Sequence, residues 1–346
     1  MKKLKAGVIG LGMGRGHIDR FNAHPAVEVV AIADLDKELL AKVGEEKGIT
    51  NRYDDPEKMI AEAGLDMVAI AVPNKFHKPL TISALRAGLD VICEKPMAMN
   101  AKEAEEMLEV AKETGKKLQI NFSFRFTPQS YAMKKQVESG VLGEIYFCRT
   151  VWQRRRGMPR FGGWFGIKEL SGGGPLIDLG VHRLDLALWL MDYPEPEWVM
   201  ASTYNHIASA QAKKEGKKFD VEDFATAMIK FKNGTSLELE ASWAGNIKER
   251  EMMSTRLLGT EGGLYQRNLE EGYQFEAEFY FEKDGCHYDM KLHPPVPACK
   301  DGFYEFVESV INDTPVPAPG EHGVIVMKLL DAIYESAEKG VPIRIS

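Results

Sequence analysis

Short apolar runs alternate with helix-like segments throughout the first 122 residues of the chain. The runs have the length of buried strands, and they are KAGVIG, VEVVAIAD, DMVAIAVP, LDVICEKP and KKLQINFSF. Segments with helical spacing, such as AKEAEEMLEVAKETG, separate the runs and end at glycine. Buried strands that alternate with helices form a parallel sheet covered on both faces, and right-handed crossovers make it doubly wound. We therefore predict an α/β domain with a doubly wound parallel sheet over residues 1–122.

The pattern changes after residue 122. From residue 196 to about 292, the sequence is typical of strands, and two alternating runs flank an Asn-Gly turn at Asn233 and Gly234. Two helical segments, DGFYEFVESVIND and HGVIVMKLLDAIYESAEKG, follow. Because 346 residues are too many for one ordinary core, we predict a second domain over 123–346. Its fold is α+β, with a large, mostly antiparallel sheet and helices on one face.

The composition excludes several classes of partner. The formal net charge is −7, and neither part of the chain is basic, so we expect no nucleic acid and no anionic membrane as partner. No stretch approaches the roughly 18 apolar residues of a membrane span. The four cysteines are far apart and form no CxxC pair, which argues against a zinc site and fits a reducing cytoplasm. We expect a cytoplasmic protein without a metal.

A glycine-rich turn follows the first apolar run and precedes a helical pattern. Gly10, Gly12 and Gly14 stand in GVIGLGMGRGH, where the third glycine comes one residue earlier than in the usual G-x-G-x-x-G fingerprint. Such a turn lets backbone N–H groups approach a pyrophosphate at a helix N-terminus. Asp34 ends the second run, where an acid binds the hydroxyls of an adenine ribose and repels a 2′-phosphate. The pattern predicts a dinucleotide site that prefers NAD over NADP; the alternative is a tight turn without a ligand.

Polar residues follow two later strands at the edge where ligands bind in doubly wound sheets. Glu94 and Lys95 stand in ICEKP, and Asn74 and His77 stand in VPNKFH. A lysine at this edge can polarise a carbonyl or stabilise an alkoxide. The alternatives are a surface Lys–Glu pair, a helix-capping asparagine and a surface histidine, and the motifs alone do not separate these readings.

The segment SGGGPLIDLGVHRLD places three glycines before an apolar helix that begins at about Leu176. On this helix Asp178 and His182 are four residues apart and share one face. A glycine at position 180 costs roughly 1 kcal/mol relative to alanine, which suggests that another group passes close to the backbone. We expect the glycine run to leave room for a flat ring such as nicotinamide. The alternative for His182 is a satisfied core histidine, and Asp185 is interpreted as structural.

Taken together, these motifs resemble the glucose–fructose oxidoreductase / inositol dehydrogenase (Gfo/Idh/MocA) family over nearly the whole chain. The matching segments include the glycine turn up to His17, VPNKFH, EKP, FSFRFTP, ESGVLGEI, GGGPLIDLGVHRLD and VEDFATAMIKFKNG. The resemblance implies a Rossmann domain followed by an open-sheet domain that commonly forms homodimers or homotetramers. It also implies NAD(P)-dependent oxidation or reduction of sugars, cyclitols and related polyols.

The resemblance also implies the residues of the site. The family's catalytic lysine corresponds to Lys95, and its catalytic aspartate and histidine correspond to Asp178 and His182. Residues expected to contact the cofactor are Gly10, Gly12, Met13, Gly14, Asp34, Pro73, Asn74, His77, Glu94, Lys95, Asn121 and Trp164. Residues expected to contact the substrate are Lys95, Arg125, Gln153, Arg156, Asp178 and His182. The arginine-rich segment WQRRRGMPRF is expected to contact the substrate, and the alternative is a solvated strand end whose arginines face water. The acids of DVED at 220–223 are given no catalytic role.

These groups suggest a mechanism. His182 takes the proton of a substrate hydroxyl, Asp178 orients the imidazole, and Lys95 stabilises the developing alkoxide. The leading hypothesis is therefore a dehydrogenase of a sugar, glycoside or cyclitol. The second is a redox-neutral enzyme that oxidises a sugar carbon transiently, eliminates a group and reduces the carbon again with tightly bound NAD. A third, a cofactor-sensing scaffold without activity, is disfavoured because all three catalytic groups are present.

Overall fold

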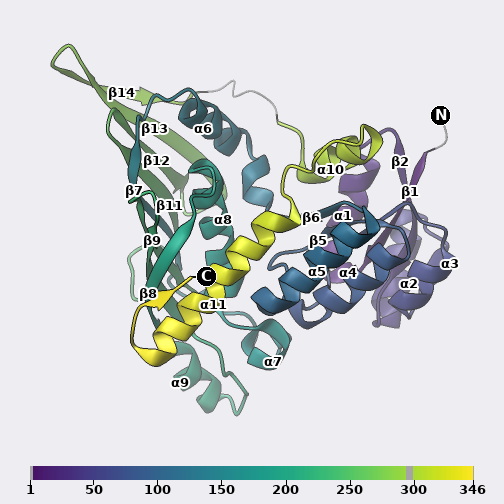
Figure 1. The fold of residues 1–346 in the computed structure, drawn as a ribbon. Coiled ribbons are helices and arrows are strands. Elements are labelled where there is room, and N and C mark those ends of the chain that lie inside the picture. The colour runs from purple at the N-terminus through teal and green to yellow at the C-terminus, as the bar shows by residue number, and fades with distance from the viewer. Residues whose placement is uncertain (1–2, 294–298, 346) are drawn as a thin grey trace. The chain divides into compact units, whose positions relative to one another are not determined.

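The computed structural model describes residues 3–293 and 299–345. The chain divides into two compact units (Figure 1). Unit 1 comprises Met1–Phe122 and Lys300–Met327, and unit 2 comprises Ser123–Cys299 and Lys328–Ser346. The sequence pattern predicts a second domain that contains all of 123–346. Instead, the segment 300–327 belongs to unit 1, because the apolar face of α10 (Gly302–Ile311) is buried in the core of that unit.

Unit 1 is built on a six-stranded parallel sheet with the strand order β3-β2-β1-β4-β5-β6. This order confirms the predicted doubly wound Rossmann sheet. The strands are β1 (Leu4–Ile9), β2 (Val27–Ala33), β3 (Asn51–Tyr53), β4 (Met67–Ile70), β5 (Asp90–Cys93) and β6 (Leu118–Ile120). The connecting helices are α1 (Leu11–Asn22), α2 (Lys37–Lys47), α3 (Pro56–Glu62), α4 (His77–Arg86) and α5 (Ala101–Thr114).

Local signals set the helix ends in unit 1. Asp36 caps α2 by accepting hydrogen bonds from the N–H groups of Glu38 and Leu39, and Asn100 caps α5 in the same way. Gly48 and Gly115 end these two helices in the left-handed conformation. The helices are therefore fixed at positions that the sequence shows directly, and the strand ends between them form the edge where the polar residues lie.

Unit 2 contains a nine-stranded sheet with the order β14-β13-β12-β11-β7-β10-β9-β8-β15. Only β7 and β10 pair in parallel, so the predicted mostly antiparallel sheet is confirmed. Its strands are β7 (Ile145–Arg154), β8 (Pro196–Tyr204), β9 (Phe224–Phe231), β10 (Ser236–Ser242), β11 (Glu251–Gly259), β12 (Gly262–Leu269), β13 (Gln274–Lys283), β14 (Cys286–Lys291) and β15 (Ile343–Arg344). The predicted hairpin around Asn233 and Gly234 joins β9 to β10.

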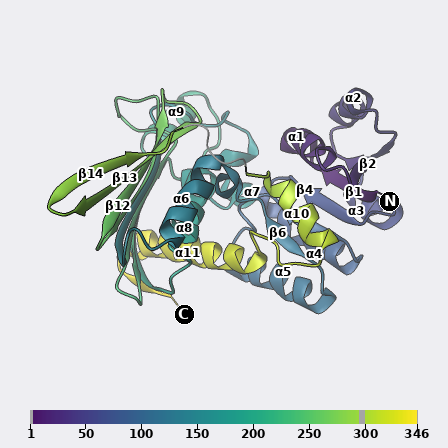
Figure 2. The ribbon, with the colours of Figure 1, turned by 90° about the horizontal axis from the view of Figure 1, so that it is seen from above.

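The helices of unit 2 cover one face of its sheet. Figure 2 shows α6 (Pro128–Glu138) and α8 (Val181–Leu190) on this face, while no helix of the described residues covers the other. The remaining helices are α7 (Lys168–Ser171), α9 (Ile207–Lys214) and α11 (Gly320–Lys339), the last of which continues from unit 1 into unit 2. Within the described residues, no helix is both long and apolar enough to cross a bilayer.

Candidate active site

The glycine turn of unit 1 is shaped by close packing at two of its three glycines. Gly10 has φ +86°, and a Cβ there would lie 2.3 Å from the carbonyl oxygen of Ala71. A Cβ on Gly14 would lie 2.8 Å from Cγ1 of Val8, so Gly14 allows α1 to pack closely on β1. Close helix–strand packing is the role of the third glycine in the usual fingerprint. The early position of this glycine therefore preserves its function.

Gly12 differs from the other two glycines because a Cβ there would meet no described atom within 4 Å. It lies in the first turn of α1, whose N–H groups have no partner within the helix and attract anions. Met13 beside it is exposed. The bare backbone at Gly12 and the helix N-terminus fit the phosphates of a dinucleotide.

Asp34 lies directly after β2 and holds the glycine turn in place. Its Oδ2 accepts a hydrogen bond of 2.7 Å from the N–H of Leu11, and its Oδ1 accepts one of 2.8 Å from the N–H of Asp36. Each carboxylate oxygen has a further lone pair, so the same group can also accept hydrogen bonds from ribose hydroxyls. The residues of unit 1 therefore fit NAD, and the preference over NADP stays a prediction.

Glu94 forms a buried polar cluster at the ends of β5 and β6. Its Oε1 accepts a hydrogen bond of 2.6 Å from Nδ2 of Asn121 and lies 2.8 Å from Nε2 of His17. Burial alone would raise the pKa of Glu94, but the hydrogen bond and charge of His17, with Asn121 and Lys95, lower this pKa to about 2. His17 in turn packs against Phe303 of α10, with ring centroids 4.7 Å apart. Glu94 is thus a fixed anion beside Lys95, which is half-buried.

His77 was expected to contact the cofactor, but the structure gives it another role. The side chain is fully buried, with Nδ1 2.7 Å from the carbonyl oxygen of Pro96 and Nε2 2.9 Å from that of Val72. Burial lowers the pKa of His77. This imidazole therefore ties the loop after β4 to the loop after β5, and we leave it out of the cofactor contacts. Pro73 and the buried Asn74 stand at the start of the turn before α4, and their contact with the cofactor stays a prediction.

In unit 2, Asp178 and His182 lie where a π-helical turn, Leu176–Gly180, continues into α8. The sequence predicts a regular helix here, whereas the structure has a π-helical turn. Such turns occur frequently at functional sites. Oδ2 of Asp178 accepts a hydrogen bond of 3.0 Å from the indole Nε1 of Trp243, which is fully buried after β10. The ring of His182 packs against Phe124 at 5.1 Å and Trp152 at 5.7 Å between centroids. The carboxylate and the imidazole are thus held by aromatic side chains.

The glycine run before this turn is packed against the protein itself. A Cβ on Gly173 would lie 1.9 Å from the hydroxyl oxygen of Tyr334, and one on Gly174 would lie 2.1 Å from the carbonyl oxygen of Glu222. A Cβ on Gly180 would approach Ala241 of β10 to 3.2 Å. The expectation that these glycines make room for a flat ring is therefore replaced by a simpler reason, which is close packing within unit 2.

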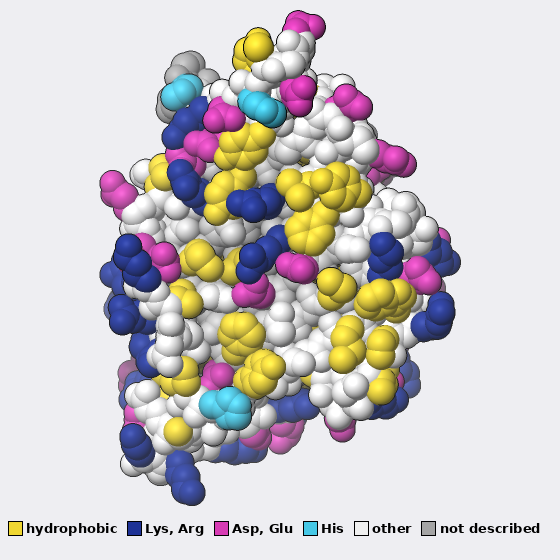
Figure 3. Space-filling view, turned by 90° about the vertical axis from the view of Figure 1, so that its left-hand side faces the viewer, with side chains coloured by type: hydrophobic (Ala, Val, Ile, Leu, Met, Phe, Trp, Pro, Cys, Tyr) yellow, Lys and Arg dark blue, Asp and Glu magenta, His cyan; other side chains and the backbone are white. Residues whose placement is uncertain are grey.

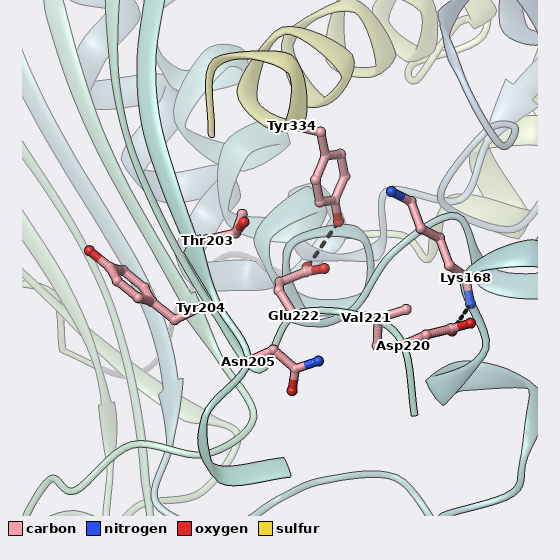
Figure 4. Close-up of a pocket in the computed structure, with 8 residues that line it drawn as sticks. All are labelled: Lys168, Thr203, Tyr204, Asn205, Asp220, Val221, Glu222 and Tyr334. Atoms are coloured by element: carbon pink, nitrogen blue, oxygen red, sulfur yellow. Dashed lines mark hydrogen bonds between the residues drawn. The ribbon is translucent and has the colours of Figure 1, made fainter. Parts of the chain in front are cut away.

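Glu222 fixes the position of the glycine run, a role that the sequence analysis missed. Its carboxylate accepts hydrogen bonds from the N–H groups of Gly174 (2.9 Å) and Leu176 (3.1 Å) and from the hydroxyl of Tyr334 (2.9 Å; Figure 4). Burial raises the pKa of Glu222, and these three donors oppose the effect. The acid-rich segment DVED was the only available signal for Glu222 in the sequence. Nothing near this segment indicates that Glu222 binds the backbone of Gly174, 48 residues away.

The other two acids of DVED also bind backbone N–H groups. Asp220 accepts a hydrogen bond of 2.7 Å from the N–H of Lys168 at the start of α7 (Figure 4), and Asp223 accepts two of 2.7 Å from the N–H groups of Ile207 and Ala208 at the start of α9. Carboxylates stabilise helix N-termini in this way. All three acids therefore organise the backbone of unit 2.

Arg125 was expected to bind substrate, and the structure corrects this expectation. Its side chain is 2% exposed, and its Nε donates a hydrogen bond of 2.9 Å to Oδ2 of Asp185. Nη2 donates to Oδ1 of the same carboxylate at 2.5 Å and also to the hydroxyl of Tyr193. Burial raises the pKa of Asp185, and the charge of Arg125 opposes this shift. Arg125 is thus committed to a buried ion pair with Asp185.

Gln153 also lies away from His182. Successive side chains of a strand point to opposite faces, and Trp152 faces His182. Gln153 therefore points to the other face of the sheet, where its Nε2 donates a hydrogen bond of 2.6 Å to Glu240. We correct its assignment and leave it out of the site.

Two residues of the β7–α8 connection keep their expected roles as predictions. Arg156 is exposed, and it donates hydrogen bonds to the carbonyl oxygen of Gly245 (3.1 Å) and to Oδ1 of Asn246 (2.9 Å). Trp164 is half-buried and stacks on Phe165, with centroids 3.9 Å apart.

Two family models match this chain. An oxidoreductase family with an NAD-binding Rossmann fold matches residues 4–122, and the C-terminal α/β domain of that oxidoreductase family matches residues 134–345. The chain belongs to the Gfo/Idh/MocA oxidoreductase family. The resemblance drawn from the motifs is therefore confirmed, and the protein is an enzyme, an NAD(P)-dependent dehydrogenase or reductase.

Two curated relatives and one solved structure match this chain over almost their full length. D-glucoside 3-dehydrogenase of Escherichia coli (strain K12) is 34% identical over 355 residues, which cover 99% of this chain and 97% of that protein. Levoglucosan dehydrogenase of Pseudarthrobacter phenanthrenivorans is 28% identical and covers 98% and 97% of the two chains. A levoglucosan dehydrogenase solved in complex with NADH and levoglucosan has a TM-score of 0.87 at 26% identity, over 99% of this chain and 100% of that one.

Over residues 3–293 and 299–345, no group of three or more histidine, cysteine or acidic side chains could hold a metal ion. The available groups are the carboxylate of Asp178, the imidazole of His182 and the ammonium of Lys95. A carboxylate and an imidazole can transfer a proton, and an ammonium can stabilise negative charge on an oxygen.

Proposed function

We propose that this oxidoreductase is an NAD-dependent dehydrogenase that oxidises a secondary hydroxyl of a glucoside-type sugar to the ketone. The setting of Asp178 and His182 carries the proposal, because a carboxylate held by Trp243 and an imidazole held by aromatic rings share one short helical stretch. The similarity to a D-glucoside 3-dehydrogenase over the whole chain supports the glucoside as substrate class.

The roles of the three side chains follow from their chemistry. His182 accepts the proton of the substrate hydroxyl, Asp178 holds the imidazole in its reactive tautomer, and Lys95 stabilises negative charge on the same oxygen. The aromatic rings around His182 exclude water from the imidazole and fix its orientation. When bound, the nicotinamide supplies the acceptor for the hydride.

Unit 1 supports NAD as the cofactor. Asp34 faces the glycine turn, and the two residues after it, Leu35 and Asp36, carry no positive charge that would bind a 2′-phosphate. A carboxylate at this position repels that phosphate. We therefore expect NAD to give the higher kcat/KM.

One spectrophotometric screen tests the proposal. NAD and NADP are each supplied with inositols, free aldoses, methyl glucosides and disaccharides, and the absorbance of the reduced cofactor is followed. We expect NADH with glucosides, and His182→Ala lowers kcat at least 100-fold while NAD binding is retained. A His182→Ala variant within a few-fold of wild type contradicts the assignment. Conversion of a sugar without net NADH formation favours the redox-neutral alternative.

We further propose that the open face of the nine-stranded sheet joins two copies of the chain. Exposed apolar side chains, among them Met200, Tyr204 and Met228, alternate on this face with charged ones such as Arg149 and Glu240 (Figure 3). An uncovered sheet face on which exposed apolar side chains alternate with charged ones resembles the mixed composition of many protein interfaces. Light scattering is expected to measure the molar mass of a dimer or tetramer in solution. Met228→Glu is expected to shift this molar mass toward that of the monomer.

A further inference from the structure

A hydrogen-bonded cluster of side chains lies where β7, β11 and the β12–β13 turn meet. Oε1 of Glu251 accepts hydrogen bonds of 2.7 Å from Nε1 of Trp152 and of 2.7 Å from Nε of Arg154. Nη2 of Arg154 donates a hydrogen bond of 2.9 Å to the hydroxyl of Tyr273, which lies 3.4 Å from Oε1 of Glu251. The side chains of Arg154 and Glu251 are only 22% and 14% exposed. The cluster is therefore a preorganised polar network.

This cluster adjoins His182 through Trp152. The indole ring lies 5.7 Å from the imidazole and 6.1 Å from the ring of Tyr273, and the guanidinium carbon of Arg154 lies 5.4 Å from the indole centroid. Burial would lower the pKa of Arg154, but Glu251, Tyr273 and the charge of Asp178 raise it. Two independent relationships, ring packing and electrostatics, thus place Arg154 and Tyr273 beside the proposed catalytic pair.

Tyr273 combines exposure with rigidity. Its side chain is 60% exposed, yet its hydroxyl is fixed by Arg154, and its ring packs edge-on against Trp152. The turn that carries it is held by Asn268, whose Nδ2 donates to the carbonyl oxygens of Glu251 (3.1 Å) and Gly272 (3.2 Å). A rigid, exposed aromatic ring gives contact area to a ligand at low cost in conformational entropy.

The charges of the cluster select the ligand chemistry. Arg154 and Glu251 form an ion pair of 2.7 Å, so the cluster as a whole is neutral and does not favour an anionic group. Nε and Nη2 of Arg154 form the bonds described above. Among residues 3–293 and 299–345, Nη1 has no hydrogen-bond partner, and it can donate to a hydroxyl or ether oxygen. An exposed aromatic face beside neutral donors and acceptors suits a neutral, hydroxylated ring.

We propose that Tyr273 and Arg154 form a subsite for the second ring of a glycoside, next to the sugar that is oxidised. The inference rests on the proposed function and narrows its substrate from glucoside-type sugars to glucosides with a carbohydrate aglycone. The face of Tyr273 packs against the C–H face of the second ring, and Arg154 donates to one of its oxygens. Both residues determine specificity and take no part in the proton transfer.

Steady-state kinetics test the subsite with two substrate sets, methyl α- and β-D-glucopyranoside against α- and β-linked glucose disaccharides. For wild type, we expect kcat/KM to be at least 10-fold higher for one disaccharide than for the methyl glucoside of the same anomer. Tyr273→Ala is expected to remove this preference by raising the KM for the disaccharide. The kcat/KM for the methyl glucoside is expected to change less than twofold. Tyr273→Phe, which keeps the ring and loses the hydroxyl contact, is expected to retain part of it.

Tyr146→Ala is the matched control. Tyr146 is a similarly exposed tyrosine, 54% exposed, at the other end of β7, eight residues or about 26 Å of strand from Arg154. Tyr146→Ala is expected to leave kcat/KM unchanged for both the disaccharide and the methyl glucoside. Equal losses on both substrates in Tyr273→Ala, or no disaccharide preference in wild type, overturn the subsite.

Failure of the proposed function is distinguishable from failure of the subsite. If no sugar yields net NADH, calorimetric titration of the NAD-loaded protein with the same disaccharides and methyl glucosides measures the subsite directly. Tighter disaccharide binding that Tyr273→Ala removes then supports the subsite and rejects only the dehydrogenase reaction. Equal affinities for the disaccharides and methyl glucosides reject the subsite.

Discussion

The indole Nε1 of Trp243 donates a hydrogen bond of 3.0 Å to Oδ2 of Asp178. Trp243 is fully buried directly after β10, and its own backbone is fixed by Asp223, whose carbonyl oxygen accepts from the N–H of Trp243 at 3.0 Å. The orientation of the carboxylate therefore depends on a residue 65 positions away in the sequence. This relationship makes Trp243 a positioning residue for the proposed reaction.

Trp243→Phe keeps an aromatic ring and removes the N–H donor. A hydrogen bond to a charged group contributes about 1.5–3 kcal/mol, so we expect kcat to fall roughly 10- to 100-fold with a smaller change in KM. Steady-state kinetics on the best glucoside provide the measurement. Trp198→Phe on β8, a half-buried tryptophan, serves as the control for general loss of volume. An unchanged kcat in Trp243→Phe contradicts a role in orienting Asp178.

Removal of one partner of the Arg125–Asp185 pair is expected to destabilise the protein. Arg125→Met leaves the carboxylate of Asp185 buried without a counter-charge, which costs about 3–5 kcal/mol. The double variant Arg125→Met/Asp185→Leu is expected to recover most of this loss, because neither charge then remains. Urea unfolding measures both effects. Wild-type stability together with a raised KM in Arg125→Met would restore the substrate role that the sequence suggested.

The sequence predicts the parts of the fold that local patterns determine. The six-stranded sheet follows from apolar runs such as VEVVAIAD, and the β9–β10 hairpin follows from Asn233–Gly234, because the signal lies within a few residues. The glycine turn and Asp34 are also recognisable, since their spacing reflects one supersecondary unit.

Partners that are distant in sequence could not be predicted in this way. Arg125 pairs with Asp185 across 60 residues, and Glu222 binds the glycine run across 48, so neither contact has a local signature. Gln153 was misassigned because the sequence does not show which face of β7 points to His182. Likewise, nothing near residue 300 indicates that Phe303 and Phe306 complete the core of unit 1.

The low pKa of Glu94 predicts a dependence of stability on pH. Its folded pKa of about 2 lies below the ordinary 4.5, so the charged form stabilises the folded state above pH 4.5. This contribution is lost as pH falls from 4.5 toward 2. Between pH 6 and pH 3.5, we expect the difference in unfolding free energy between wild type and Glu94→Gln to shrink by about 1 kcal/mol.

Denaturant unfolding at these two pH values measures the difference. Glu308→Gln is the matched control, because Glu308 pairs with His24 in unit 1 but is 41% exposed. The pH dependence of its effect is expected to be clearly smaller, since solvent screens the pair. The same pH dependence in both variants would show that burial of Glu94 does not increase its contribution to the unfolding free energy.

The open backbone at Gly12 predicts a separation of cofactor binding from stability. Gly12→Ala meets no described atom within 4 Å and improves helix propensity, so the melting temperature is expected to stay constant or to rise slightly. The added methyl group stands where we expect backbone N–H groups to approach the pyrophosphate, so the Kd for NAD is expected to rise at least 10-fold. Gly16→Ala, one turn further along α1 and equally unobstructed, should change stability in the same direction and leave the Kd unchanged. Calorimetric titration with NAD decides the matter, because equal affinities of the two variants would place the pyrophosphate away from this turn.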